Sequence, residues 1–282
     1  MDTVAHFLNP LLMILMPLAL GAILARRWKV SWGLFFVGAA AFIGSQVFHI
    51  PFNAWILGPA LQSLDGTLPE RAATLVTALA LGLSAGLFEE TARYLALRTR
   101  EPHVRTWRNA VMLGAGHGGI ESIILGVLVF YGFLQALALR DADLTALGLA
   151  GQQAQLAAYW SAPWYLTLMG ALERASAITI QITLTVIVLQ VFLRRNGSWL
   201  VLAIGVHTLA NAAGLLALEF WGAYWAEVVI LGVALAGLAV TIGLRSPELP
   251  QPVPAESAEP ARGPLAENPE PNIDQLEDSR YA

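Results

Sequence analysis

The sequence contains no cysteine and few charged residues. With no Cys among its 282 residues, disulfides, thiolate catalysis and cysteine-ligated metals are excluded. Only 13% of the residues are Asp, Glu, Lys or Arg, whereas 56% are hydrophobic, and the mean hydropathy is +0.60. An average soluble domain has about 25% charged residues. The composition therefore indicates a polytopic membrane protein, embedded in lipid.

The negative net charge comes from the C-terminal end of the chain. Residues 246–282 contain eight acidic and two basic residues, so the net charge of −4 becomes +2 when they are left out. The overall charge therefore says nothing about nucleic-acid binding. We expect no nucleic-acid partner. Because residues 246–282 are rich in Pro and Glu, we expect a disordered cytoplasmic tail there, after a seven-helix domain at residues 1–245.

Seven hydrophobic stretches are long enough to cross a bilayer, which takes about 20 helical residues. We expect spans at residues 7–25, 32–52, 71–97, 109–139, 164–193, 199–220 and 224–244. The predicted fold class is all-α. The connection at residues 141–163 contains spaced leucines and glutamines, and we expect a helix there that lies in the membrane interface.

The basic residues accompany alternate connections between these spans. They are Arg26, Arg27 and Lys29, then Arg98, Arg100, Arg105 and Arg108, then Arg194 and Arg195, and finally Arg245. Connections rich in Lys and Arg face the cytoplasm. With seven crossings, the N-terminus should lie outside and the C-terminus in the cytoplasm, in a bacterial cell membrane.

Three of the hydrophobic stretches carry ionisable residues about one helical turn apart. The clusters are Glu89 and Glu90 with Arg93, His117 with Glu121, and His207 with Asn211. Residues four apart share a helix face, and a charge at the bilayer centre costs at least ~2.5 kcal/mol. Glu89, His117 and His207 each lie about 12 to 14 Å from the cytoplasmic end of their spans. We therefore expect one polar site made by the third, fourth and sixth spans.

Each of these features also has a structural interpretation. Glu90 and Arg93 could neutralise each other as an i,i+3 pair, and a single histidine could be a hydrogen-bonded core residue. The glycines around His117, at positions 114, 116, 118 and 119, could allow close helix packing or leave space for a substrate backbone.

Further polar residues occur toward the outer ends of the spans. The adjacent pair Glu173 and Arg174 is most simply structural. The group at positions 46, 49 and 53 favours hydrogen bonding between helices. Gln181, nearer mid-depth, is a candidate substrate contact.

Four sequence elements in a fixed order carry a resemblance to a known family. They are F-E-E-T-A-R-Y at residues 88–94, G-H-G-G-I-E-S at 116–122, E-R at 173–174 and H-T-L-A-N at 207–211. In these elements the chain resembles the YhfC family of intramembrane peptidases. That family looks like a branch of the group containing CAAX prenyl proteases, bacteriocin-processing (CPBP) enzymes and PrsW proteases. The wider group has E-E-x-x-x-R and F-x-x-x-H, whereas this chain has E-E-x-x-R and Leu113 in place of the aromatic residue.

The resemblance implies an intramembrane endopeptidase that acts on a peptide or a membrane protein through glutamate-activated water, at a cytoplasm-facing site. Glu89 is the implied base, assisted by His117, and Glu90 tunes it. His207 and Asn211 are the implied donors to the tetrahedral oxyanion, which peptide hydrolysis requires in addition to a base. The implied supporting residues are Arg93, Glu121, Glu173 and Arg174.

Other functions are compatible with the same residues. Glu89, His117 and His207 could bind zinc, with Glu121 or Glu90 as the base. Because the H-E-x-x-H signature is absent, we expect no cofactor and keep zinc as the alternative. A proton-coupled transporter could use the same groups as a relay, but the spans lack the paired internal prolines expected of one. A membrane scaffold without catalytic activity is the remaining alternative.

Overall fold

The computed structural model describes residues 2–64 and 66–246, so the predicted tail lies outside the described residues except for Ser246. Every regular element in the described part is a helix, which confirms the all-α prediction. Seven helical segments there are long and apolar enough to cross a membrane. The expected spans all correspond to these segments.

The elements follow one another with short connections, apart from the one before α6. They are α1 (Asp2–Trp28), α2 (Trp32–Phe52), the π-helical turn η1 (Asn53–Leu57), α3 (Gly58–Gln62), α4 (Glu70–Arg98), η2 (Pro102–Val104), α5 (Trp107–Ala138), η3 (Ala150–Gln152), α6 (Gln153–Ser161), α7 (Trp164–Thr167), α8 (Met169–Leu193), α9 (Ser198–Trp221) and α10 (Ala223–Gly243).

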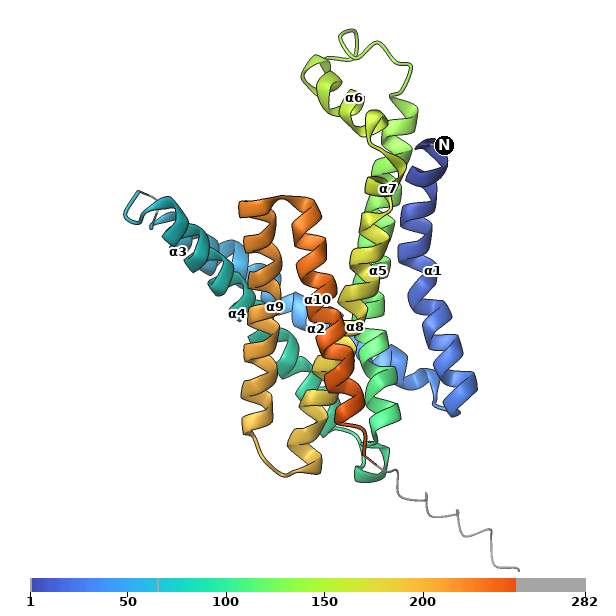
Figure 1. Ribbon diagram of the computed structural model, residues 1–282, viewed down its shortest axis with the longest axis vertical. Helices are drawn as coiled ribbons and strands as arrows, with labels where there is room; N and C mark the ends of the chain where they lie inside the picture. The colour runs from blue at the N-terminus through green and yellow to red at the C-terminus, as the bar shows by residue number, and fades with distance from the viewer. Residues whose placement is uncertain (1, 65, 247–282) are drawn as a thin grey trace, which may run out of the picture. The chain divides into compact units, whose positions relative to one another are not determined.

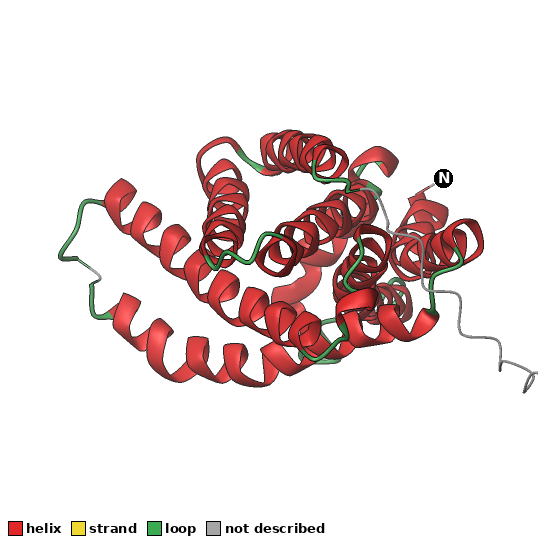
Figure 2. Ribbon diagram, turned by 90° about the horizontal axis from the view of Figure 1, so that it is seen from below, coloured by secondary structure: helices red, strands yellow, loops and turns green. Residues whose placement is uncertain are grey.

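The second span is longer than the sequence predicted. We expected it to end at Phe52, next to Pro51, but the helical segment continues through η1 and α3 to Gln62. Proline removes one backbone donor, and a π-helical turn is one way for a helix to continue past such an interruption. Helices α2 and α4 slant away from the other helices toward their shared connection (Figure 2).

The connections that carry the basic residues lie at one end of the bundle (Figure 1). This end contains the α1–α2, α4–α5 and α8–α9 connections and the end of α10. The N-terminus and the long connection with α6 lie at the opposite end. Helix α6 is the helix that we expected within residues 141–163. Which end faces the cytoplasm stays a prediction from the charges.

Helix α5 packs closely against three neighbours, and its glycines make this possible. A Cβ atom on Gly116 would lie 1.9 Å from the carbonyl oxygen of Phe35 in α2. One on Gly119 would lie 3.0 Å from Pro17 in α1, and one on Gly114 would lie 2.7 Å from the backbone of α8. The glycines around His117 thus permit helix packing, and neighbouring helices fill the space considered for a substrate backbone.

Helix α4 approaches α9 equally closely. A Cβ atom on Gly82 would lie 2.6 Å from the carbonyl oxygen of Thr208, and one on Gly86 would lie 2.9 Å from that of Ile204. This contact brings the turn of α4 that carries Glu89 and Glu90 beside His207.

Candidate active site

Glu89 lies at the centre of a polar network that joins five helices. Its side chain is buried, and its Oε2 atom accepts hydrogen bonds from His117 Nε2 and Gln181 Nε2, both at 3.2 Å. Its Oε1 atom accepts a third bond from Gln46 Nε2 at 3.2 Å. His207 Nε2 lies 3.9 Å from Oε2. The structure therefore brings together the three residues on which the predicted site depended.

Glu90 and Arg93 form the buried pair that their spacing allowed. Arg93 Nη1 lies 2.6 and 2.7 Å from the two carboxylate oxygens of Glu90, and both side chains are fully buried. Arg93 Nη2 donates to Gln181 Oε1, and His207 Nδ1 lies 2.7 Å from Glu90 Oε1. Removing one partner of such a pair costs about 4 kcal/mol, because the other charge is left buried and unpaired. The pair thus neutralises two buried charges and links α4 to Gln181 on α8 and to His207 on α9.

The hydrogen-bond partners distinguish the two histidines. An ionised carboxylate only accepts hydrogen bonds, so His207 donates from Nδ1 to Glu90 and turns Nε2 toward Glu89. His117 donates from Nε2 to Glu89, and its buried Nδ1 has no hydrogen-bond partner among the described residues. His207 therefore contacts a carboxylate through the ring nitrogen that faces away from Glu89, whereas the corresponding nitrogen of His117 contacts none among the described residues.

A second group of side chains positions Gln46. His49 Nδ1 lies 3.2 Å from Gln46 Oε1, which leaves the amide NH₂ group of Gln46 to face Glu89. His49 Nε2 in turn contacts Ser84 at 3.1 Å and Asn53 at 2.9 Å. The prediction of helix–helix hydrogen bonding by residues 46, 49 and 53 is confirmed. We did not predict from the sequence that Gln46 reaches Glu89. Their i, i+3, i+7 spacing was the available signal.

The supporting residues on α5 and α8 are connected to Glu89 through Gln181. Gln181 Nε2 donates to Glu121 Oε2 at 3.1 Å as well as to Glu89. Glu121 accepts from Arg174 Nη1 at 2.9 Å, and Arg174 also donates to Glu173. The Glu173–Arg174 pair is thus part of the same network, and Gln181, considered only as a substrate contact, is the side chain that joins its two halves.

Asn211 lies outside the hydrogen-bonded network. It is exposed and lines a neighbouring cavity of about 610 Å³, between α4, α9 and α10. The other polar residues that line this cavity are His49, Asn53, Glu173 and Glu227, and the remaining lining is apolar or glycine. We call it the acidic chamber.

The acidic chamber lies on one side of Glu89. Its lining on α4 includes Ala78 and Ala85, which precede Glu89, and its lining on α9 begins four residues after His207. The basic connections lie at the end of α4 and at the start of α9. The lining positions on both helices are therefore toward the opposite end of the bundle. The chamber therefore lies toward the end of the bundle opposite to the basic connections, and its lining residue His49 is linked to Glu89 through Gln46.

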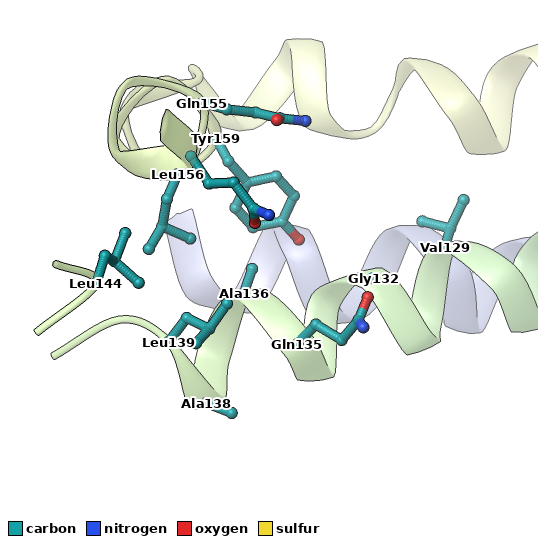
Figure 3. Close-up of a pocket in the computed structure, with 11 residues that line it drawn as sticks. Val129, Gly132, Gln135, Ala136, Ala138, Leu139, Leu144, Gln155, Leu156 and Tyr159 are labelled. Atoms are coloured by element: carbon teal, nitrogen blue, oxygen red, sulfur yellow. The ribbon is translucent and has the colours of Figure 1, made fainter. Parts of the chain in front are cut away.

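A second cavity of about 610 Å³ lies between α5 and the connection that contains α6 (Figure 3). Leu144, Leu156 and Ala136 line it together with Gln135, Gln155 and Tyr159. Burial raises the pKa of the Tyr159 phenol, so this hydroxyl stays neutral. The lining residue on α5 nearest to His117 in sequence is Val129, twelve residues further along and thus about 18 Å away. We call this second cavity the cavity under α6, and it is separate from the Glu89 network.

Glu89, His117 and His207 have the donor types that zinc prefers, namely two imidazole nitrogens and a carboxylate oxygen. Their separations from Glu89 Oε2, 3.2 and 3.9 Å, are close to the ~3.3 Å between two ligands of a tetrahedral zinc ion. As placed, no three His, Asp or Glu side chains in the described part of the chain form a ready metal site. The three residues thus match zinc in donor type and in their separations from Glu89, but as placed they do not form a metal site.

Comparison with known proteins agrees with the motifs. Residues 12–232 match the model of a family described as YhfC intramembrane metalloprotease. A protein of Bacillus subtilis (strain 168), described as uncharacterized membrane protein YhfC, is 30% identical over 233 residues, which cover 80% of this chain and 89% of that protein. No solved structure matches the chain.

Proposed function

Because this chain belongs to the YhfC family of intramembrane proteases, we propose that it is an endopeptidase whose hydrolytic water is activated by Glu89. One observation carries the proposal: a buried carboxylate is held by Gln46, His117 and Gln181 and faces the imidazole of His207. Its substrate is a peptide or a membrane protein. We also propose, from the resemblance of its motifs, that the chain is related to the wider group of CPBP and PrsW proteases.

Each side chain then has a defined task. Glu89 removes a proton from the water as it attacks the peptide carbonyl, and the proton passes to the leaving nitrogen. The amides of Gln46 and Gln181 hold the carboxylate in one orientation. His207, when protonated at both nitrogens, donates from Nε2 to the developing oxyanion, while Glu90 stabilises its positive charge. Asn211 contacts the substrate in the acidic chamber.

A zinc enzyme is the second candidate, favoured by the family description and by the Glu90–His207 pair. Histidines that bind metals usually donate their other N–H to a carboxylate, as His207 does. Glu89, His117 and His207 would hold the ion, which when bound would lower the pKa of a bound water.

The environment of His117 favours the mechanism without metal. If Nε2 bound a metal, Nδ1 would carry a buried N–H without an acceptor among the described residues, at a cost of about 1 to 3 kcal/mol. When Nε2–H donates to Glu89, only a lone pair on Nδ1 remains without a partner.

The test combines metal analysis with cleavage of a library of labelled hydrophobic peptides by detergent-purified protein. We expect no stoichiometric zinc, cleavage that resists chelators, and loss of cleavage in Glu89→Gln and His207→Ala. Glu70→Gln is the matched control, because Glu70 is exposed at the start of the same helix. Stoichiometric zinc with chelator-sensitive cleavage would establish the second candidate instead, and full activity of Glu89→Gln would refute both.

A further inference from the structure

The network and the acidic chamber together contain more negative than positive groups. The carboxylates are Glu89, Glu90, Glu121, Glu173 and Glu227, and the guanidinium groups are Arg93 and Arg174. The formal charge of this set is −3, and it is −2 when His207 is protonated at both nitrogens. Arg93 is engaged by Glu90, and Arg174 by both Glu121 and Glu173. Arg174 attracts Glu227 only at longer range, because its ion pairs are with Glu121 and Glu173.

The uncompensated charge faces the chamber. Glu173 and Glu227 both line it and repel one another, and Glu227 forms no ion pair within the described part of the chain. Glu227 lies in the first turns of α10, a candidate membrane span, where an unpaired charge is unfavourable. A cation that enters the chamber would therefore be stabilised by both carboxylates.

The rest of the chamber lining indicates what kind of cation fits. Its volume of about 610 Å³ is within the range of small-ligand sites, and most of its lining is alanine, glycine, leucine and isoleucine. A lysine or arginine side chain has an aliphatic stem for such walls and a charged head for the carboxylates. No three acidic or histidine side chains among residues 2–64 and 66–246 are arranged for a metal ion, which favours an organic cation over a metal here.

The position of the chamber connects this cation to the reaction. Ala85, in the lining, is one helical turn before Glu89, and His49 is linked to Glu89 through Gln46. A peptide chain that lies across Glu89 can therefore place a neighbouring side chain in the chamber.

We infer that the acidic chamber binds a lysine or arginine side chain of the peptide substrate, with Glu173 and Glu227 as the residues that determine this specificity. The inference rests on the proposed function, because it takes the bound peptide to be the substrate of the protease. It deepens that function by naming a substrate class, peptides with a basic residue near the cleaved bond.

The test measures binding, so that it does not depend on catalysis. Short dansyl-labelled peptides of leucine and alanine, with one central lysine, methionine or glutamate, are titrated into the Glu89→Gln protein in a nonionic detergent. We expect the lysine peptide to bind about tenfold more tightly than the methionine peptide, and the glutamate peptide to bind most weakly. In Glu89→Gln/Glu173→Gln/Glu227→Gln the lysine and methionine peptides should bind equally.

Two further variants in the Glu89→Gln background show whether the preference for lysine comes from the chamber carboxylates. Glu219→Gln, exposed on α9 and outside the chamber lining, should keep the preference for lysine. Glu227→Gln should lose most of it without disturbing Arg174, which pairs with Glu173. Unfolding temperatures of all variants show whether they are folded.

The outcomes separate the inference from the proposed function. Equal binding of the lysine and methionine peptides, or a lysine preference that survives in the folded triple variant, would overturn the inference even if the native protein cleaves peptides. A lysine preference that depends on Glu173 and Glu227, in a native protein that cleaves no peptide, would support the chamber and count against the proposed protease.

Discussion

The acidic chamber and the cavity under α6 have the same volume, about 610 Å³, but different surroundings. Two carboxylates line the chamber, which adjoins a network of buried charges around Glu89. The cavity under α6 is lined by leucine, alanine, amides and one neutral tyrosine, and it begins about 18 Å from His117 along α5. Cavity size therefore does not distinguish the two places. The convergence of charged side chains does, and it supports the site that we propose at Glu89.

The largest expected effect comes from replacing one polar group in the Glu89 network and one in the cavity under α6. Glu89→Gln should lower the rate of peptide cleavage by about 10²- to 10⁴-fold, the usual contribution of a general base. Tyr159→Phe, which removes a hydroxyl from the cavity under α6, should leave the rate unchanged. Initial rates on the same labelled peptide measure both. Comparable losses in the two variants would erase the distinction between the cavities.

Stability should differ between the two regions as well. Arg93→Met leaves Glu90 buried without its cation and should lower the free energy of unfolding by about 3 to 5 kcal/mol. Arg140→Met, at an exposed arginine that stacks on Trp160 beside the other cavity, should cost no more than about 1 kcal/mol. Denaturant titrations in detergent give both values.

A double variant checks the cause of the first loss. Because Arg93→Met/Glu90→Gln removes both charges, it should recover part of the stability. No recovery would mean that Arg93 acts through packing and not through its charge.

Two glycines of α5 make a matched pair for helix packing. A Cβ atom on Gly116 would overlap the Phe35 carbonyl, so Gly116→Ala should destabilise the protein by about 1 to 3 kcal/mol. Gly132, at the cavity under α6, has nothing within 4 Å of such an atom, so Gly132→Ala should be neutral or slightly stabilising. Thermal unfolding of the two variants is the measurement. Equal unfolding temperatures would contradict the close approach of α2 to α5.

The smallest expected effect comes from filling each cavity. Ala226→Phe narrows the acidic chamber and should lower kcat/KM for a lysine-containing peptide by about tenfold. Gly132→Phe fills part of the cavity under α6 and should change kcat/KM by no more than about twofold. Unchanged cleavage by folded Ala226→Phe would argue that substrate does not enter the chamber.

Hydropathy and charge spacing predicted much of this architecture. Seven spans follow from the length of the apolar stretches, and the cluster of Glu89, His117 and His207 follows from their similar depth. The extension of the second span beyond Pro51 did not follow, because a proline usually predicts a helix boundary and a π-helical turn has no clear sequence signal.

The uncharged polar residues of the site were harder to predict from the sequence than the charged ones. Gln46 and Gln181 both contact Glu89, but a single amide in an apolar helix is compatible with many roles. Asn211 shares a helix face with His207 in sequence, yet it lines the acidic chamber and lies outside the network. Helix rotation and tilt decide such positions, and they depend on packing between helices that no single stretch of sequence contains.

The order in which the helices enter the membrane has a consequence for the newly made chain. Glu89 and Glu90 arrive with α4, but their partners Gln181 and His207 belong to α8 and α9 and are inserted later. The network is therefore incomplete until the sixth span is in place. The proposed hydrolysis at Glu89 would therefore require that membrane insertion of the chain is nearly finished.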